Sequence, residues 1–430
     1  MSQIFFITLL ILFSIIRIPL SFIVIILRPL VPFFKTRLNF ERQNLIDEAS
    51  LINFEAHYCF EISSEGELEQ VRPLIEAVLK NNKRIEIIYS SPSVDTKIHN
   101  LYNQYKDQVR LLRMPLLSGS LLSFLYFQSV WSWVSAPVII FCRYDFFPEL
   151  LLFKLFRKKF VLVSGAFKKT SWYKLSSFKL FNVVIAATDV EKNNFETLLN
   201  KQAKVFSCDF RIPRIAQRFA NADKTLAEKS FLVPYINKLK SLPAKNKLIL
   251  GSAWQSDLSV LNNPKLIEEV KAGRLHLTIA PHKLDSQFVT DLKSSCQEIF
   301  GANHVEVVSA DNPYQDAPVV ILQMSGILCE LYSVFSMAYV GGGYERSIHS
   351  VLEPFFSNNI VVTGPKIKRS TEYDLAAEIA PDEIHVLNNP ESFYTIIEST
   401  DLSTMKIKAR EHFLLKTESE MTAIISEILK

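Results

Sequence analysis

Glycine is scarce in this chain, with 11 residues among 430. Three of them stand together at Gly341, Gly342 and Gly343, directly after the apolar run "MAYV". Glycine has no side chain, so it allows another group to come close to the backbone. The cluster therefore predicts that a ligand approaches the chain at this point.

Cysteine is also sparse, and its pattern excludes several classes of protein. The five cysteines are scattered and form no CxxC pair. We interpret them as reduced thiols of a cytosolic domain. The chain has no HExxH motif, no Cys/His cluster and no DxD pair after a predicted strand. We therefore predict no metal site and no cofactor.

Charge of one sign is lacking as well. Lysine and arginine number 48 against 44 aspartates and glutamates, which gives a net charge of +4. This balance argues against a nucleic-acid-binding protein. Hydrophobic residues make up 48% of the chain, enough for large cores in two or three domains of ordinary size.

The N-terminal stretch 4–34 is apolar apart from Arg17 and Arg28. It lacks the short apolar core and cleavage site of a signal peptide, and it is long enough to cross a bilayer. Arg17 at the bilayer centre would cost roughly 2.5–3.5 kcal/mol, and Pro19 would bend a helix. One tilted span and a half-immersed hairpin both fit this pattern, and a buried core helix is the alternative.

The orientation of this predicted anchor, residues 1–36, follows from charge. Basic residues accompany its C-terminal end: Arg28, Lys35, Arg37 and Arg42. By the positive-inside rule, the rest of the chain lies on the cytoplasmic side.

After the anchor, short apolar runs alternate with amphipathic segments, which predicts an α/β fold with parallel sheets. The alternation is interrupted by a charged stretch with three prolines and then restarts near 247. We predict two doubly wound, Rossmann-like domains facing a cleft. Their boundaries are 37–210 and 247–430, with an interdomain connection at 211–246. Ligands bind such folds at the carboxyl ends of the strands.

Acidic residues follow two predicted strands of the first domain. In "EISSEGELEQV", Gly66 and Glu67 open a helix whose N-terminus offers unpaired N–H groups. Asp145 follows the strand in "IIFCRYDFF". The two carboxylates fit a general base and its supporting partner. The alternatives are a helix-terminal charge for Glu67 and a helix cap for Asp145.

In the second domain, "YVGGGYERSIHSVLEP" predicts a strand, a glycine loop and a helix, which together suit a phosphate. The loop matches neither the GxGxxG nor the GxxxxGK[ST] motif. Glu353, about two helical turns into that helix, is placed to accept hydrogen bonds from ribose hydroxyls. A tight turn with a solvated helix face is the alternative. His282 in "IAPHKLD" is a further phosphate or base contact, or else structural.

These segments resemble the 3-deoxy-D-manno-octulosonic acid (Kdo) transferases of lipopolysaccharide synthesis, from the anchor nearly to the C-terminus. "SSEGELEQVRPLI" resembles the element that carries the family's general base, which falls on Glu67, with Ser64 and Gly66 as acceptor contacts. "RYDFFPELL" resembles E-T-E-L-W-P-N-L, with Asp145 at the second acid. "CDFRIPRI" places the residue that stabilises the transition state at Arg211.

Four segments of the second domain resemble the family's nucleotide-sugar site. "GSAWQSDLSVL" resembles G-S-T-W/H-x-x-E/D-E, and "YVGGGYERSIHSVLEP" resembles Y-I-G-G-G-F-x-x-G-I-H-N-x-L-E-P. "IAPHKLD" and "QMSGILCELY" match a donor contact and a cytidine contact. The resemblance implies these donor-binding residues: Pro281, His282, Ser325, Gly326, Ile327, Gly341, Gly342, Gly343, His349, Ser350, Val351, Leu352 and Glu353.

The chain departs from the family at four positions. They are Asp145 for Glu, Ala166 for Arg, Gln323 for Asp and Ser350 for Asn. These departures indicate a divergent member.

The resemblance implies an inverting, metal-independent glycosyltransferase of the GT-B type. Its donor would be CMP-Kdo and its acceptor a lipid A precursor at the inner membrane, with the catalytic domains on the cytoplasmic side. The alternatives are a GT-B enzyme that uses another nucleotide sugar and an inactive relative that binds lipid or nucleotide. Retention of Glu67 favours an enzyme, whereas the four departures favour an inactive relative.

Overall fold

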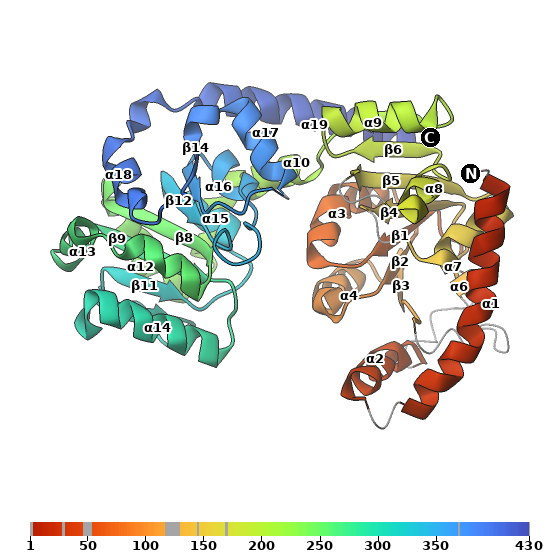
Figure 1. Cartoon of the computed structure of the whole chain (residues 1–430), viewed down its shortest axis with the longest axis horizontal. Helices are drawn as coiled ribbons and strands as arrows, with labels where there is room; N and C mark the ends of the chain where they lie inside the picture. Colours follow the sequence, from red (N-terminus) through yellow and green to blue (C-terminus); the bar gives the residue numbers. More distant parts are fainter. Residues whose placement is uncertain are drawn as a thin grey trace. The chain divides into compact units, whose positions relative to one another are not determined.

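The computed structural model describes residues 3–27, 31–45, 54–116, 130–143, 146–167, 171–368 and 370–429. The chain divides into two compact units (Figure 1). Unit 1 is Met1–Arg211 with Ser419–Lys430, and unit 2 is Ile212–Glu418.

Unit 1 is built on a parallel sheet of seven strands in the order β3-β2-β1-β4-β5-β6-β7. The strands are β1 (Tyr58–Ile62), β2 (Ile85–Tyr89), β3 (Val109–Arg113), β4 (Val138–Cys142), β5 (Lys159–Gly165), β6 (Val183–Ala186) and β7 (Lys204–Ser207). Every described strand pair in this sheet is parallel. The inner strands are largely apolar because helices cover both faces of the sheet; Glu61 in β1 and Glu86 in β2 are buried charged exceptions.

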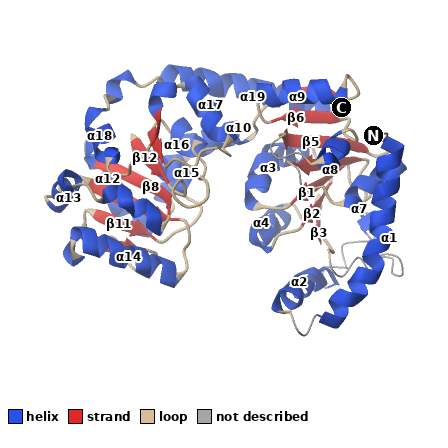
Figure 2. Ribbon diagram, viewed as in Figure 1, coloured by secondary structure: helices blue, strands red, loops and turns tan. Residues whose placement is uncertain are grey.

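Two layers of helices enclose this sheet (Figure 2). One face carries α3 (Glu65–Lys80) and α4 (Asp95–Gln104), together with the end of α19 (Ile407–Leu429). The other face carries α6 (Val130–Trp133), α7 (Pro148–Leu151), α8 (Trp172–Phe178) and α9 (Asp189–Leu199).

Unit 2 repeats this plan, with seven parallel strands in the order β10-β11-β9-β8-β12-β13-β14. The strands are β8 (Lys247–Ala253), β9 (His276–Pro281), β10 (Val305–Val308), β11 (Val319–Leu322), β12 (Met337–Val340), β13 (Ile360–Thr363) and β14 (Ile384–Val386). Neighbouring residues of β8 enter opposite cores: Leu248 and Leu250 on one face, Ile249 on the other.

The helices of unit 2 also lie on both faces of its sheet. One face carries α13 (Pro264–Lys271), α14 (Ser286–Phe300) and α18 (Ser392–Ser399). The other carries α10 (Arg211–Ala220), α11 (Ala222–Ala227), α12 (Val233–Ser241), α15 (Leu328–Tyr332), α16 (Leu352–Phe356) and α17 (Thr371–Ile379). The segment 211–246, expected as a connection, thus forms α10, α11 and α12, and from Ile212 onward it belongs to unit 2.

The C-terminus also departs from the expected boundary. Helix α19 passes from unit 2 into unit 1. Its last turns join the core of unit 1 through Ile424, Ile425 and Ile428, and the Tyr58 hydroxyl donates to the Ile428 carbonyl at 3.2 Å. Burial of these isoleucines assigns Ser419–Lys430 to unit 1, although the sequence places them at the end of the second domain.

The N-terminal stretch forms α1 (Gln3–Leu27) and α2 (Pro32–Arg42). Within the described part of the chain, no helix meets the length and apolarity that a membrane crossing requires. The expected spanning form of the anchor is therefore not supported. Phe6 and Leu10 of α1 are buried in the core of unit 1, and Phe6 lies edge-on to Tyr173 at 5.6 Å.

Other apolar side chains of these two helices are exposed. The large exposed apolar residues there are Ile4, Phe5, Ile11, Leu12, Phe13, Ile15, Ile16, Ile23, Ile26 and Leu27, and Phe33 of α2 is also exposed. We call this set the N-terminal apolar surface. Helix α1 thus has both side chains buried against unit 1, Phe6 and Leu10, and exposed apolar side chains.

Helix α2 is seated on unit 1 at the carboxyl ends of β2 and β3. Arg37 donates to the carbonyl of Ser90 and, at 2.7 Å, to that of Met114, and it pairs with Glu41 at 2.6 Å. Its side chain is only 11% exposed. Arg37, which we counted among the membrane-orienting basic residues, is therefore engaged inside the protein.

Candidate functional site

Glu67 lies at the N-terminus of α3, just past the carboxyl end of β1. It is 3% exposed, and its Oε2 accepts from the Ser63 N–H at 2.6 Å. The Ser64 hydroxyl in turn accepts from the Glu67 N–H at 3.3 Å, as in an N-terminal cap. The helix-terminal role of Glu67 is thus present in the structure, and its role as a base stays a prediction.

Gly66 lies beside Glu67 and is exposed. A Cβ at this position would meet nothing within 4 Å. Steric packing inside the protein therefore does not require a glycine here.

The neighbours of Glu67 come from the end of β4. The Cys142 thiol and the Arg143 guanidinium both donate to Gln70 Oε1, at 3.5 and 3.2 Å. Burial, followed by the negative charge of Glu67, raises the pKa of the Cys142 thiol well above its ordinary value, so the thiol is neutral at neutral pH. Asp145, the predicted second acid, lies outside the described residues.

Arg211 begins α10, and its guanidinium is paired with a carboxylate that the sequence analysis did not single out. Arg211 Nε lies 2.9 Å from Asp209 Oδ1, and its Nη2 lies 2.5 Å from Oδ2. Asp209 is 5% exposed. A bidentate ion pair of this kind fixes the direction of the guanidinium.

In unit 2, the three glycines directly follow β12. A Cβ on Gly341 would lie 2.3 Å from the Ser252 carbonyl oxygen, and one on Gly343 would lie 2.6 Å from Gly364 Cα. Gly342 has φ of +90° and would meet the Ser347 carbonyl at 2.5 Å. The packing of the protein's own backbone already requires glycine at all three positions, so our inference from glycine content to a ligand was incomplete.

Asp257 holds this glycine loop in place and was missed as a site residue. It is fully buried, and its carboxylate accepts from the N–H groups of Gly342 and Trp254, both at 2.9 Å, and from the Tyr339 hydroxyl at 2.8 Å. Burial raises the pKa of Asp257, and these three hydrogen bonds oppose the shift.

The predicted helix begins later than expected. Turns follow the glycines, and the His349 N–H donates to the Gly341 carbonyl at 3.1 Å. Helix α16 starts only at Leu352. Glu353 therefore lies in the first turn of α16, which corrects the expected two turns. The Val351 N–H donates to Glu372 at 3.1 Å, and Val351 and Leu352 are fully buried.

Arg218 of α10 brings two predicted donor contacts together. It pairs with Glu330 through Nε at 2.7 Å and Nη2 at 2.6 Å, and Nη2 also donates to the Gly326 carbonyl at 3.1 Å. Its Nη1 lies 3.6 Å from Glu353 Oε1. Ser325 and Gly326 are exposed, whereas Ile327 is buried. No motif in the sequence pointed to Arg218, because its partners come from α15 and α16.

Three rings meet at the carboxyl ends of β8, β9 and β12. We call Trp254, His282 and His349 the ring cluster. His282 stacks on Trp254 with centroids 4.4 Å apart and on His349 at 4.2 Å. The Trp254 Nε1–H donates to His349 Nε2 at 2.9 Å. Pro281 is buried beside the exposed His282, and Ser350 is half-buried beside His349.

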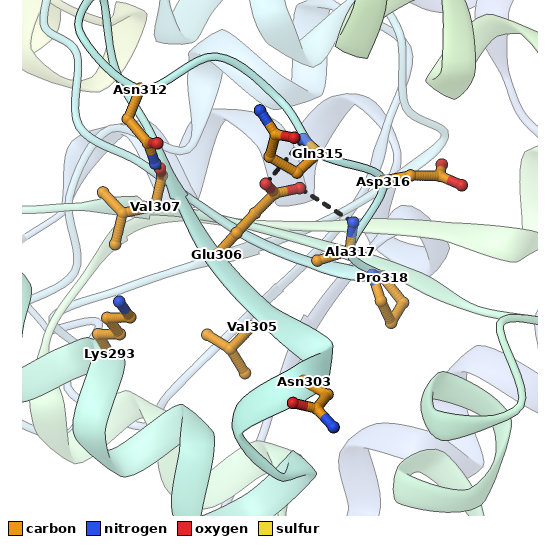
Figure 3. A pocket seen from close by; sticks show the side chains of 10 residues that line it. All are labelled: Lys293, Asn303, Val305, Glu306, Val307, Asn312, Gln315, Asp316, Ala317 and Pro318. Carbon is orange, nitrogen blue, oxygen red and sulfur yellow. Dashed lines mark hydrogen bonds between the residues drawn. The ribbon is translucent and has the colours of Figure 1, made fainter.

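The described ranges contain no group of three or more His, Cys, Asp or Glu side chains arranged for a metal ion. A cavity of about 310 Å³ lies along β10, where Glu306 accepts from the N–H groups of Gln315 and Ala317 (Figure 3). None of the predicted site residues lines this cavity.

No protein-family model matches the chain. The chain is 25% identical over 321 residues to the 3-deoxy-D-manno-octulosonic acid transferase of Aquifex aeolicus (strain VF5), which covers 74% of this chain and 78% of that protein.

Solved structures with the same fold are more distant in sequence. The UDP-GlcNAc 2-epimerase of Neisseria meningitidis, bound to UDP-GlcNAc, superposes with a TM-score of 0.55 at 12% identity, over 85% of this chain and 100% of that chain. A ugt transferase of Siraitia grosvenorii, in complex with UDP, gives 0.51 at 8% identity, over 87% and 100%. This likeness concerns the fold alone.

The two parallel sheets and these likenesses define the GT-B fold, and the curated relative supports a glycosyltransferase. The resemblance predicted from the motifs is confirmed: the chain is a divergent, Kdo transferase-like protein.

Replacing Gly343 by alanine tests the packing explanation for the glycine loop. The added Cβ would overlap the Gly364 backbone, so we expect a loss of about 1–3 kcal/mol in the free energy of unfolding, measured with urea. Gly66→Ala is the matched control and should stay within about 0.5 kcal/mol of the parent. An unchanged Gly343→Ala midpoint would contradict the explanation.

The ring cluster predicts a pH dependence of stability. Burial, followed by His282, lowers the pKa of His349 from 6.5 to about 4. The unfolded chain therefore takes up this proton first, and stability present above about 6.5 is lost as the pH falls toward 4. Urea midpoints at pH 7.5 and 5.5 should differ less in His349→Gln than in the parent. Equal differences would show that His349 does not contribute.

Proposed function

We propose that the chain is an inverting, metal-independent glycosyltransferase that moves Kdo from CMP-Kdo to a lipid A precursor. The observation that carries the proposal is at one edge of the sheet in unit 2. Gly326, Glu353 and the ring cluster, all within motifs that resemble the Kdo transferases, lie at the carboxyl ends of its strands. Nucleotides bind at this edge in open α/β sheets.

The donor would be held by polar groups that the fold already positions. Glu353 accepts hydrogen bonds from the ribose hydroxyls, and Arg218 holds its carboxylate by charge from 3.6 Å. The exposed Ser325 and Gly326 contact the cytosine. His282, with the neighbouring Lys283, faces the phosphate, for which positive and N–H groups are the natural partners.

The acceptor hydroxyl would lose its proton to Glu67. Ser64 and the exposed Gly66 contact the acceptor beside this carboxylate. The hydroxyl oxygen attacks the anomeric carbon of Kdo in line, the bond to the phosphate oxygen breaks, and CMP leaves with that electron pair. Arg211, oriented by Asp209, offsets the charge that develops on the leaving phosphate.

Two other functions keep some support. Gln323 and Ser350 differ from the family pattern at the donor segments, which favours a different nucleotide sugar. The same departures, with Ala166 and Asp145, favour an inactive relative that binds nucleotide or lipid. Turnover with CMP-Kdo separates the proposed function from both alternatives, and turnover with another nucleotide sugar would separate the alternatives from each other.

We also propose that unit 1 lies on the cytoplasmic face of the inner membrane through the N-terminal apolar surface. Apolar side chains on one side of a helix, with exposed Lys35 and Arg42 nearby, suit insertion into the headgroup boundary next to anionic lipid. The half-immersed arrangement fits a helix whose other side is held by Phe6 and Leu10 in the protein core.

Glu67→Gln tests the reaction. Release of CMP from CMP-Kdo should require the lipid A precursor, and the variant should lose about 10²–10⁴-fold in turnover because an amide is no base. EDTA should leave the parent's turnover unchanged. A variant that keeps more than about a tenth of the parent's turnover would remove Glu67 from the base role. No CMP release by the parent protein would refute the proposed function.

Glu353→Ala tests the donor site by calorimetric titration with CMP. Loss of hydrogen bonds to a charged group should cost about 1.5–3 kcal/mol of binding free energy, which is roughly a 10- to 150-fold weaker affinity. Glu378→Ala, which removes an exposed carboxylate from α17, is the control and should bind CMP as the parent does. Equal affinities of the parent and Glu353→Ala would place the ribose elsewhere.

Co-sedimentation with vesicles that contain anionic lipid tests the membrane proposal. Ile16→Asp and Ile26→Asp each place a charge on the N-terminal apolar surface and should lower the bound fraction severalfold. Val190→Asp changes an apolar side chain that is equally exposed on α9 and should have no effect. If Ile16→Asp and Ile26→Asp bound vesicles as the parent does, the surface would not contact lipid.

A further inference from the structure

The ring cluster is assembled from three neighbouring strands of unit 2. Trp254 follows β8, His282 follows β9, and His349 follows the glycine loop after β12; these strands are adjacent in the order β9-β8-β12. Sequence reasoning singled out both histidines but not Trp254. The tryptophan contacts both of them, by stacking on His282 and by a hydrogen bond to His349.

The geometry of Trp254 and His349 is that of a hydrogen bond in the plane of both rings. Their planes are 7° apart and their centroids 6.4 Å apart, and the indole Nε1–H lies 2.9 Å from His349 Nε2. The two rings therefore meet edge to edge, and His282 covers both at 22° to each. A length of 2.9 Å is the usual value for a well-formed N–H hydrogen bond.

This bond decides which nitrogen of His349 carries the proton. An indole nitrogen can only donate, so His349 Nε2 must accept with its lone pair. A neutral imidazole carries one N–H, which then sits on Nδ1. Adding a second proton at Nε2 would set two N–H groups against each other. The lowered pKa of His349, about 4, agrees with a ring that stays neutral at neutral pH.

Both partners are themselves held in place. A Cβ on Gly342 would lie 3.0 Å from His349 Cδ2, so the glycine makes room for the imidazole. The His282 ring stacks on the indole at 4.4 Å, and Lys283 Nζ lies 5.3 Å above it. Asp257 accepts from the backbone N–H of Trp254 at 2.9 Å. The indole donor therefore has a fixed direction.

We infer that Trp254 is a positioning residue that fixes His349 with its proton on Nδ1, so that the imidazole offers a neutral N–H donor to an anionic oxygen of the ligand. The assignment of that ligand as a nucleotide rests on the proposed function, whereas the tautomer rests on the Trp254–His349 contact alone. A neutral donor adds direction without adding charge, which is left to Lys283.

The tautomer is read directly by ¹⁵N NMR of the full-length protein labelled in histidine, with His349→Gln to assign the signals. In the parent, Nε2 of His349 should show the shift of an unprotonated nitrogen and Nδ1 that of a protonated one. Trp254→Phe keeps an aromatic ring and removes the donor. It should move the proton of His349 toward Nε2, because no donor then occupies the lone pair of that nitrogen.

Phe288→Leu is the matched control, because it removes an aromatic ring 5.9 Å from the indole and leaves the hydrogen bond; its His349 shifts should match those of the parent. A parent protein with the proton on Nε2 would overturn the inference, as would a Trp254→Phe variant with unchanged His349 shifts. The parent measurement needs no variant, so it decides the matter even if Trp254→Phe does not fold.

The proposed donor role of His349 is tested with CMP as the probe. CMP should shift the Nδ1–H signal of His349 in the parent, and Trp254→Phe should bind CMP at least threefold more weakly than Phe288→Leu. Saturating CMP that leaves the His349 signals unmoved would overturn the donor role. The proposed function fails separately, if the parent releases no CMP from CMP-Kdo while the tautomer is as inferred.

Discussion

The buried carboxylate of Asp257 is the interaction on which the candidate donor site depends. It accepts three hydrogen bonds, from the backbone of Gly342 and Trp254 and from the Tyr339 hydroxyl. A buried carboxylate is costly unless its oxygens are satisfied, so these donors are held firmly in return. These bonds fix the end of β12 against the start of the segment after β8. They thereby also fix the direction of the indole. The edge-to-edge bond between Trp254 and His349 follows from that arrangement.

In each unit, an arginine is held in place by carboxylates. Arg218 gathers Glu330, Glu353 and the Gly326 carbonyl in unit 2, and Arg211 is paired with Asp209 in unit 1. Groups that are oriented before a substrate binds need no reorganisation during a reaction, which is the main requirement for electrostatic catalysis. The pair with Asp209 would hold the Arg211 guanidinium ready for the proposed transfer.

The N-terminal helices connect the site of unit 1 with the proposed membrane contact. Helix α1 buries Phe6 and Leu10 and carries the exposed residues of the N-terminal apolar surface, while Arg37 fixes α2 at the carboxyl ends of β2 and β3. Glu67 follows β1, the neighbour of β2. The predicted base Glu67 and the contacts that fix α2 therefore lie at the same edge of this sheet.

The sequence by itself determined the two parallel sheets, because runs such as Ile85–Tyr89 and Val183–Ala186 are a local pattern. It also located His282, His349 and Glu353 within motifs, since those depend on spacing along the chain. Only the tertiary structure decided what these residues touch. The backbone of Gly364 leaves no room for a side chain at Gly343, and Arg218 pairs with Glu353. Ser419–Lys430 belongs to unit 1, and Trp254 determines which nitrogen of His349 carries the proton. Each of these contacts joins segments far apart in the chain, and no local pattern of residues encodes such a contact.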